Sequence, residues 1–240
     1  MTESAAGETG AGALAITGGT VVTLDRPSVE RRDVVLGTGA RRTLDASGCL
    51  VLPGLAIAHT HLYSALACGM PGPGEPPRSF REILEKVWWR LDAALDEKSL
   101  EASADLALLD AVLSGVTAVI DHHESPSFIG DSLDVLARAS RSSGVKAALC
   151  YGATDRHGAD GARAGLAECE RAIRAGLPAM VGLHAGFTVS DATLASAADL
   201  AKRTGRWLHV HAAEDRCDAG SFERLEKAGR HFAARQIGRL

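Results

Sequence analysis

The sequence lacks the features that mark proteins for export or for membranes. Its five cysteines are odd in number and show no Cys-x-x-Cys spacing, so we expect no disulfide framework and a reducing, cytoplasmic environment. The stretch MTESAAGETGAG carries acidic residues where a signal peptide needs a basic start and an apolar core. No apolar run approaches the roughly 20 residues that span a bilayer. These absences predict a soluble protein without a membrane partner.

Clusters of basic residues are absent as well. The net charge is −4, the isoelectric point is about 6.1, and Lys and Arg are scattered along the chain, which argues against nucleic acid as a partner. Hydrophobic residues make up 46% of the 240 residues, enough to bury a sizeable core. The balance is that of a soluble globular protein and fits an enzyme. It leaves open whether the protein forms a homo-oligomer.

The pattern along the chain changes twice and predicts three parts. Residues 1–12 are small, polar and rich in Gly, which predicts a disordered tail. Residues 13–50 hold short β-branched segments separated by Gly, Asp and Arg, and predict a small β domain. Residues 51–240 alternate between apolar runs and longer amphipathic segments, which predicts an α/β domain.

Five β-α units are expected in this third part. Its predicted strands are continuous apolar runs, as in parallel strands that are covered on both faces. They lie at residues 50–58, 116–120, 145–152, 179–187 and 206–214. The predicted helices lie at residues 79–95, 99–114, 131–143, 162–175 and 190–205, with a last one beginning at Ser221. Five such units cannot close an eight-stranded barrel, so the first and fifth strands are expected to be unpaired edges.

Histidines gather at the carboxyl ends of the predicted strands, where a parallel (β/α)8 barrel builds its active site. Seven of the nine histidines have this placement: His59, His61, His122, His123, His184, His209 and His211. In the strand that ends PGLAIAHTH, residues two apart point to one face, so His59 and His61 aim at one point. A single buried histidine is more often a packed residue than a ligand, but its repetition over four strands indicates a metal site.

The fifth strand offers two candidates for a third metal ligand. We prefer His211 to His209 because Glu214 follows it by three residues. A carboxylate at that spacing can lie beside the water that the metal holds and transfer its proton. Without His211, Glu214 would be interpreted as an ordinary solvated carboxylate.

Four segments in order resemble the amidohydrolase superfamily of metal-dependent hydrolases. They are PGLAIAHTHLYSALACGM, GVTAVIDHHESP, GLHAGFTVSD and HVHAAEDR. Within the superfamily they resemble the aminohydrolase and chlorohydrolase group, and the paired histidines of IDHH most resemble SsnA-type aminohydrolases. The resemblance covers residues 13–240 and implies a TIM-type (β/α)8 barrel, here incomplete, with a flanking β-sandwich to which residues 13–50 contribute a part.

The resemblance also implies roles for individual residues. His59, His61 and His211 match ligands of one divalent ion, with zinc favoured and iron the alternative. Glu214 matches the catalytic acid that transfers protons. His184 matches a histidine that contacts substrate and takes part in catalysis.

Other positions of this region carry open interpretations. His122 and His123 are candidates for substrate binding or for hydrogen bonding at the barrel rim. Trp88 and Trp89 can line a substrate pocket, although packing in a helix core is the preferred reading.

The function implied by the resemblance is hydrolysis of a non-peptide carbon–nitrogen bond, as in deamination of a heterocyclic or amidine-like small molecule. The family's sixth-strand histidine and eighth-strand aspartate have no counterpart up to residue 240, so the sequence corresponds to the family's N-terminal part and looks like a fragment. Two alternatives stay open: an inactive remnant or subunit that needs a partner, and dehalogenation by a chlorohydrolase on the same scaffold.

Overall fold

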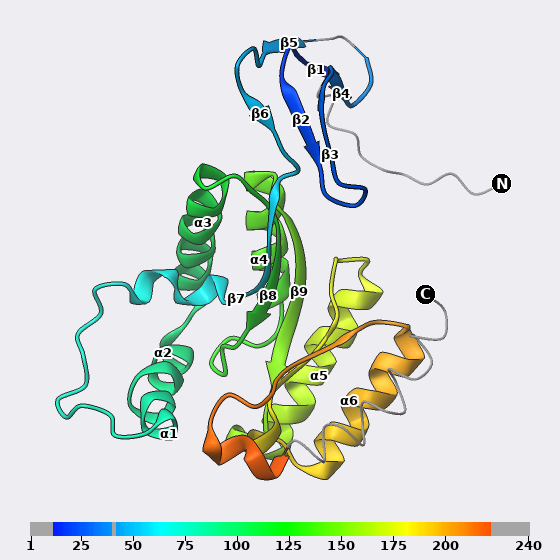
Figure 1. Ribbon diagram of the computed structural model, residues 1–240. Helices are drawn as coiled ribbons and strands as arrows, with labels where there is room; N and C mark the ends of the chain where they lie inside the picture. The colour runs from blue at the N-terminus through cyan, green and yellow to red at the C-terminus, as the bar shows by residue number, and fades with distance from the viewer. Residues whose placement is uncertain (1–11, 40–41, 222–240) are drawn as a thin grey trace. The chain divides into compact units, whose positions relative to one another are not determined.

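The computed structural model describes residues 12–39 and 42–221 (Figure 1). The predicted tail, apart from Gly12, and the predicted helix that follows Ser221 lie outside these ranges. The chain forms two compact units, Met1–Gly54 and Leu55–Leu240. The sequence-based boundary at residues 50 and 51 lies in a short strand, and the domain limits inferred from sequence stay predictions.

The first unit consists of two three-stranded sheets. In one, β1 (Leu14–Thr17) pairs antiparallel with β4 (Val34–Leu36) and parallel with β5 (Arg42–Asp45). In the other, β2 (Thr20–Thr23) lies between β3 (Ser28–Arg31) and β6 (Leu50–Val51). The buried apolar side chains of this unit are small: Ala13, Ala15, Val21 and Ala46. The short strands that the sequence predicts in this part are confirmed.

The second unit is built on a parallel five-stranded sheet with the order β11-β10-β9-β8-β7. The strands are β7 (Leu55–Thr60), β8 (Val116–His123), β9 (Lys146–Ala153), β10 (Val181–Ala185) and β11 (Leu208–His211). Chain order equals spatial order, as in part of a (β/α) barrel. The predicted α/β fold is therefore confirmed, and β7 and β11 are the two edges of this sheet among the residues that the structure describes.

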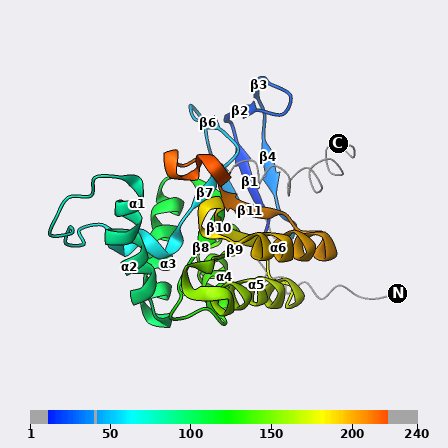
Figure 2. The same cartoon turned by 90° about the horizontal axis from the view of Figure 1, so that it is seen from below.

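Helices cover one face of the sheet. They are α3 (Glu97–Leu113), α4 (Ser132–Ser143), α5 (Gly158–Arg174) and α6 (Asp191–Thr204), and each contacts the next. Figure 2 shows α4, α5 and α6 side by side along the sheet. The core lies between these helices and the central strands, where leucines such as Leu133, Leu149 and Leu183 are fully buried. This packing fixes the carboxyl ends of the strands, where the histidines lie.

Two predicted elements differ from those observed. The strand expected at 50–58 is divided into β6 and β7, because Pro53 has no N–H to donate to a ladder and Gly54 follows it. The helix expected at 79–95 is α1 (Phe80–Ile83), a π-helical segment (Leu84–Trp88) and α2 (Trp89–Ala94). Interruptions of this kind often occur at functional sites.

The predicted helix signals at other positions are observed. Ser79 caps α1 by accepting a hydrogen bond from the Glu82 N–H. Gly144 and Gly205 end α4 and α6 with φ angles of 76° and 66°, a left-handed conformation that glycine adopts without a steric penalty.

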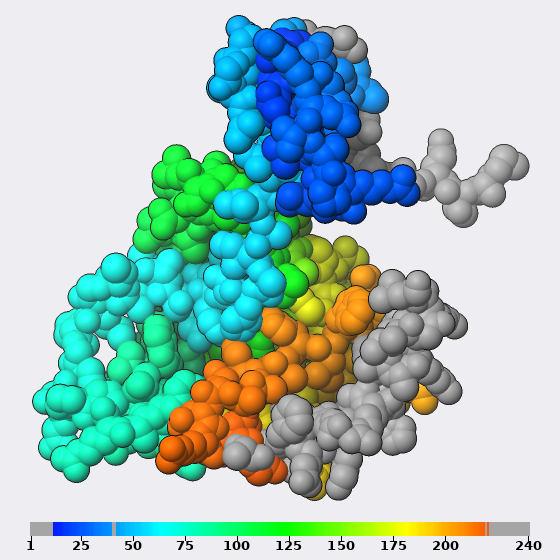
Figure 3. Space-filling model, viewed as in Figure 1, coloured from blue at the N-terminus to red at the C-terminus, as the bar shows by residue number. Residues whose placement is uncertain are grey.

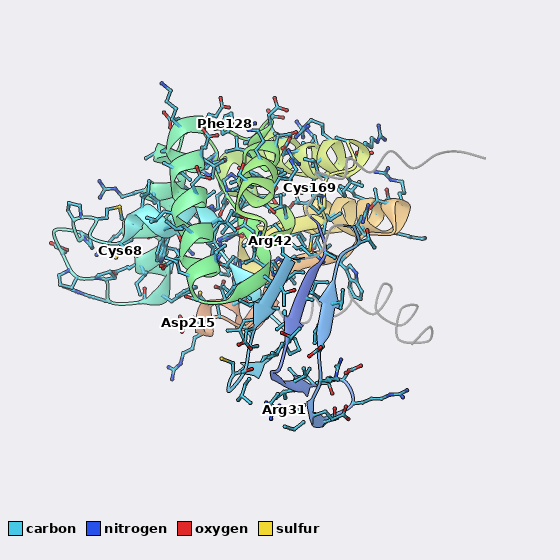
Figure 4. All side chains as sticks on the ribbon, turned by 90° about the horizontal axis from the view of Figure 1, so that it is seen from above. Arg31, Arg42, Cys68, Phe128, Cys169 and Asp215 are labelled. Carbon is cyan, nitrogen blue, oxygen red and sulfur yellow. The ribbon has the colours of Figure 1, made fainter. Side chains whose placement is uncertain are left out.

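No helix within residues 12–39 and 42–221 combines the length and apolar character needed to cross a membrane. All five cysteines are free thiols. Figure 4 shows Cys68 and Cys169 well apart on separate segments.

Candidate metal centre and substrate cavity

The carboxyl ends of β7 and β11 bring three of the predicted ligands together. One nitrogen from each of His59, His61 and His211 lies within 4.8 Å of the others. The Nε2 atoms of His59 and His211 are 3.1 Å apart. Three imidazoles held this closely are a donor set that zinc or a similar divalent ion accepts.

Hydrogen bonds fix the tautomers of two of these histidines. His61 Nδ1 donates to the carbonyl oxygen of His122 at 2.7 Å, and His211 Nδ1 donates to that of His184 at 2.7 Å. A carbonyl oxygen can only accept, so each Nδ1 carries the hydrogen and each Nε2 presents a lone pair. Both Nε2 atoms are therefore in the state that binds a metal.

Loss of hydration favours the neutral form of the three imidazoles, although His59 itself is exposed. It lowers the pKa of His61 to about 4. Burial also lowers the pKa of His59 and of His211 below the usual value. Because a protonated imidazole cannot bind a metal, these shifts favour binding at neutral pH.

Glu214 lies on the turn after β11 and lines the same cavity as His61, His184 and His211. The Asp218 carboxylate accepts a hydrogen bond from the Ala213 N–H at 2.6 Å, and Ala213 has a φ of 60°. This bond holds a strained turn beside the site. Glu214 is exposed, and partial desolvation by its surroundings, followed by the charge of Asp218, raises its pKa above the usual value. In Figure 3 the segment with β11 and the turn lies at the surface of the second unit.

His184 projects from β10 into the cavity with a defined tautomer. Its Nδ1 lies 2.8 Å from Thr188 Oγ1, whose hydroxyl donates to the Ala185 carbonyl oxygen at 3.0 Å. Since that hydroxyl has one hydrogen, His184 Nδ1 is the donor and His184 Nε2 is an acceptor. Burial lowers the pKa of His184 well below the usual value, so the ring is neutral.

The paired histidines of β8 point to opposite faces of the strand, as neighbours in a strand do. The His122 ring faces the metal-site histidines, with its centroid 4.3 Å from that of His211. His123 Nε2 lies 2.7 Å from Ser125 Oγ, and its ring packs against Tyr63 and Tyr151. Neither histidine lines the cavity, so their substrate-binding role stays a prediction without contact support.

The cavity beside the histidines has a volume of about 220 Å³. Its other walls come from the interrupted helix, which contributes Phe80, Leu84, Trp88 and Trp89. Both tryptophans therefore line the cavity, the reading that the sequence analysis ranked second. A π-helical segment followed by α2 turns these aromatic side chains toward the strand ends.

Three charged residues of this cavity region were missed by the sequence analysis. Arg156 donates to Glu124 and to Asp92, the latter at 3.3 Å, and its guanidinium lies 4.4 Å from the centroid of the Trp89 ring. They come from the position after β8, from α2 and from the segment after β9, so no local spacing connects them. Glu124 directly follows the histidine pair, and that position at a strand end was the one available signal.

Glu124 also approaches the predicted substrate-contacting histidine. Its Oε2 lies 3.7 Å from His184 Nε2. Burial raises the pKa of Glu124 to about 8 and that of Asp92 to about 6, against the lowering effect of Arg156 on both. Two buried carboxyls that share one guanidinium are thus not both ionised at neutral pH.

Replacing Glu124 with Gln should remove a pH dependence of stability. A carboxyl whose pKa rises from 4.5 to about 8 on folding stabilises the protein fully below pH 4.5, and this stabilisation is lost as the pH rises through about 8. As the pH rises through that interval, the free energy of unfolding of the wild type should fall relative to that of Glu124→Gln. The fall should be up to about 1.4 kcal/mol per pH unit. Denaturant unfolding at several pH values measures this. Parallel pH profiles for the two proteins would contradict the shift, and exposed Glu75→Gln is the control.

Residues 50–231 match the amidohydrolase family. The chain belongs to this family. Amidohydrolase relatives include a 5-methylthioadenosine/S-adenosylhomocysteine deaminase 2 from Archaeoglobus fulgidus, 35% identical over 71% of this chain and 40% of the relative. A 5'-deoxyadenosine deaminase from Methanosarcina acetivorans is 29% identical over 95% of this chain and 50% of its own length.

Solved amidohydrolase structures have the same fold. An atrazine chlorohydrolase from Arthrobacter aurescens TC1 complexed with zinc matches with a TM-score of 0.69 and 21% identity, over 90% of this chain and 58% of that chain. The chain spans about half the length of the curated relatives that it matches.

Proposed function

We propose that the natural protein is a metal-dependent hydrolase that deaminates a small amino-heterocycle, converting a C–NH2 group and water into a carbonyl and ammonia. The observation that carries this proposal is the cluster of three imidazoles, two of which line one cavity together with Glu214 and His184. The deaminase names of the two curated relatives support the reaction type. Nucleosides and free bases that carry an exocyclic amine are the first substrates to test.

The geometry of the donor atoms supports a zinc ion. Ligand nitrogens of tetrahedral zinc lie about 3.3 Å apart for metal–nitrogen distances of about 2.0 Å. The 3.1 Å between the Nε2 atoms of His59 and His211 is close to that spacing. A bound cation would lie between these two nitrogens when both present lone pairs. The chemistry that a bound zinc ion supplies is activation of water as a nucleophile.

Glu214 acts as the general acid and base in this proposal. Its pKa is raised above the usual value, which is the direction that favours a group that both receives and delivers a proton. It takes a proton from the attacking water and delivers one to the leaving amine. Asp218 maintains its position by fixing the turn.

His184 positions the substrate by accepting a hydrogen bond. Because its Nδ1 donates to Thr188, its Nε2 can accept from a ring N–H or an amino group. The aromatic side chains of Phe80, Trp88 and Trp89 provide flat apolar walls for a planar ring.

The proposal is tested on the protein at its natural length, by measuring zinc content and ammonia release from aminated nucleosides and bases. We expect one zinc per chain, ammonia release from at least one such compound, and loss of both in His61→Ala. Chelation should abolish the activity and added zinc should restore it. Chloride release from a chlorinated triazine without ammonia release would favour dehalogenation, and the absence of both activities would favour the inactive remnant.

A cytoplasmic location is also proposed. Cys49, Cys68 and Cys217 are exposed free thiols, which persist in a reducing compartment. Fractionation of the source cells tests the location.

A further inference from the structure

His59 differs from the other two candidate ligands in what holds its Nδ1. The Nδ1 atoms of His61 and His211 donate to backbone carbonyls, whereas His59 Nδ1 lies 3.2 Å from the Nε2 atom of the His209 side chain. No motif assigns a role to His209, which the sequence analysis set aside in favour of His211. Its position beside His59 needs an explanation of its own.

The contacts continue from His209 into the sheet. His209 Nδ1 lies 3.5 Å from the Sγ atom of Cys150. Cys150 Sγ in turn lies 3.5 Å from the backbone carbonyl oxygen of Asp121. The series joins four strands, β7, β11, β9 and β8, and Cys150 is fully buried within it.

Only one direction of donation along this series leaves the His59 Nε2 atom free to bind a metal. The Asp121 carbonyl oxygen can only accept, so the Cys150 S–H donates to it and the sulfur lone pairs face His209. His209 Nδ1–H then donates to the sulfur, and His209 Nε2 accepts from His59 Nδ1–H. His59 is left with its Nε2 lone pair directed at the Nε2 atom of His211, 3.1 Å away.

We propose that His209 and Cys150 are positioning residues that fix the tautomer and orientation of His59 for metal binding. This inference rests on the proposed metal site of His59, His61 and His211. The pair does for His59 what a carbonyl oxygen does for each of the other two ligands. Such partners of metal ligands typically contribute about 10–100-fold to metal affinity.

A second metal ion is the competing explanation for the same residues. Nitrogens of His122 and His209 and the sulfur of Cys150 all lie within 4.8 Å of one another. Binding there through His209 Nδ1 would move the hydrogen of His209 to Nε2, which faces His59 Nδ1. His59 would then carry its own hydrogen on Nε2 and be lost as a ligand of the first ion. The placement of hydrogens on the ring nitrogens therefore favours a single metal ion, with His209 and Cys150 as the residues that position His59.

The test is zinc affinity of the metal-free protein at natural length, measured by competition with a chromophoric chelator. His209→Phe removes the acceptor and should weaken zinc binding about 10–100-fold. His209→Gln offers an amide oxygen near the position of Nε2 and should restore affinity close to that of the wild type. Cys150→Ala should cause a smaller loss. Cys169→Ala is the matched control, because that buried thiol on α5 (Figure 4) also donates to a backbone carbonyl, that of Tyr151, and has no hydrogen bond to a histidine of the described residues.

Thermal unfolding of each metal-free variant shows whether it is folded, so that weak binding is not mistaken for misfolding. Wild-type affinity in folded His209→Phe would overturn the inference. Two zinc ions in the wild type, one of them lost in Cys150→Ala, would also overturn it and establish the second site. If the wild type binds no zinc, the proposed function fails; if it binds zinc and His209→Phe binds equally well, this inference alone fails.

Discussion

Glu214→Gln is expected to lower turnover by about 10²–10⁴-fold in the natural-length protein, the range for loss of a general acid or base. The amide keeps the size of the side chain but can neither take a proton from water nor deliver one to an amine. Glu214 lines the cavity with His61 and His211 but is not among the grouped metal-site residues, so zinc content should stay unchanged. Steady-state kinetics of ammonia release and metal analysis measure the two effects.

The neighbouring Asp215→Asn is the matched control for this prediction. Asp215 (labelled in Figure 4) is an exposed carboxylate of the same turn and does not line the cavity. It should retain activity. Full turnover in Glu214→Gln would remove Glu214 from the mechanism, and loss of zinc in that variant would reassign it as a ligand.

Arg156→Met is expected to lower the free energy of unfolding by about 3–5 kcal/mol, the cost of breaking a buried ion pair from one side. The Arg156 side chain is 8% exposed, and the side chains of its partners Asp92 and Glu124 are each 2% exposed. Without the guanidinium their carboxyls lose their only cationic partner among the residues described. The stacking of Arg156 on Trp89 is lost as well.

Equilibrium unfolding in denaturant measures this loss, and Arg163→Met provides the control. Arg163 pairs with Asp160, but its side chain is 71% exposed, and a surface pair contributes about 0–1 kcal/mol. Adding Glu124→Gln to Arg156→Met should recover part of the stability, because one buried acid is then removed. A loss no larger than that of the control would show that the cluster does not stabilise the fold.

Local sequence patterns were enough to predict most of the strands and helices of the second unit and their order. Continuous apolar runs separated by helices with caps and terminal glycines predict parallel β-α units, and the five strands are observed in that order. These signals lie within single elements, since hydrophobic period, caps and turns act between residues that are close in the chain. The division of the first strand at Pro53 and the π-helical segment before Trp89 depend on backbone details that the hydrophobic pattern does not express.

Part of the candidate site could be predicted because histidines recur at the carboxyl ends of several strands. The i, i+2 spacing of His59 and His61 and the placement of His211 before Glu214 were enough to group these residues before their distances were known. Strand alternation also implies that His122 and His123 face opposite sides. It does not say which of them faces the metal-site histidines, because that depends on the packing of β8 against its neighbours.

Sequence by itself determined the family, the parallel β-α architecture and the residues offered as metal ligands, because motifs and periodicity are local properties. Only the tertiary structure brings Asp92, Glu124 and Arg156 together beside the cavity. It also places the His209 side chain next to His59 Nδ1, and Cys150 next to His209. Each of these contacts joins elements that are separated by many residues. Their meeting is set by strand order and by helix packing on the sheet, which no spacing along the chain records.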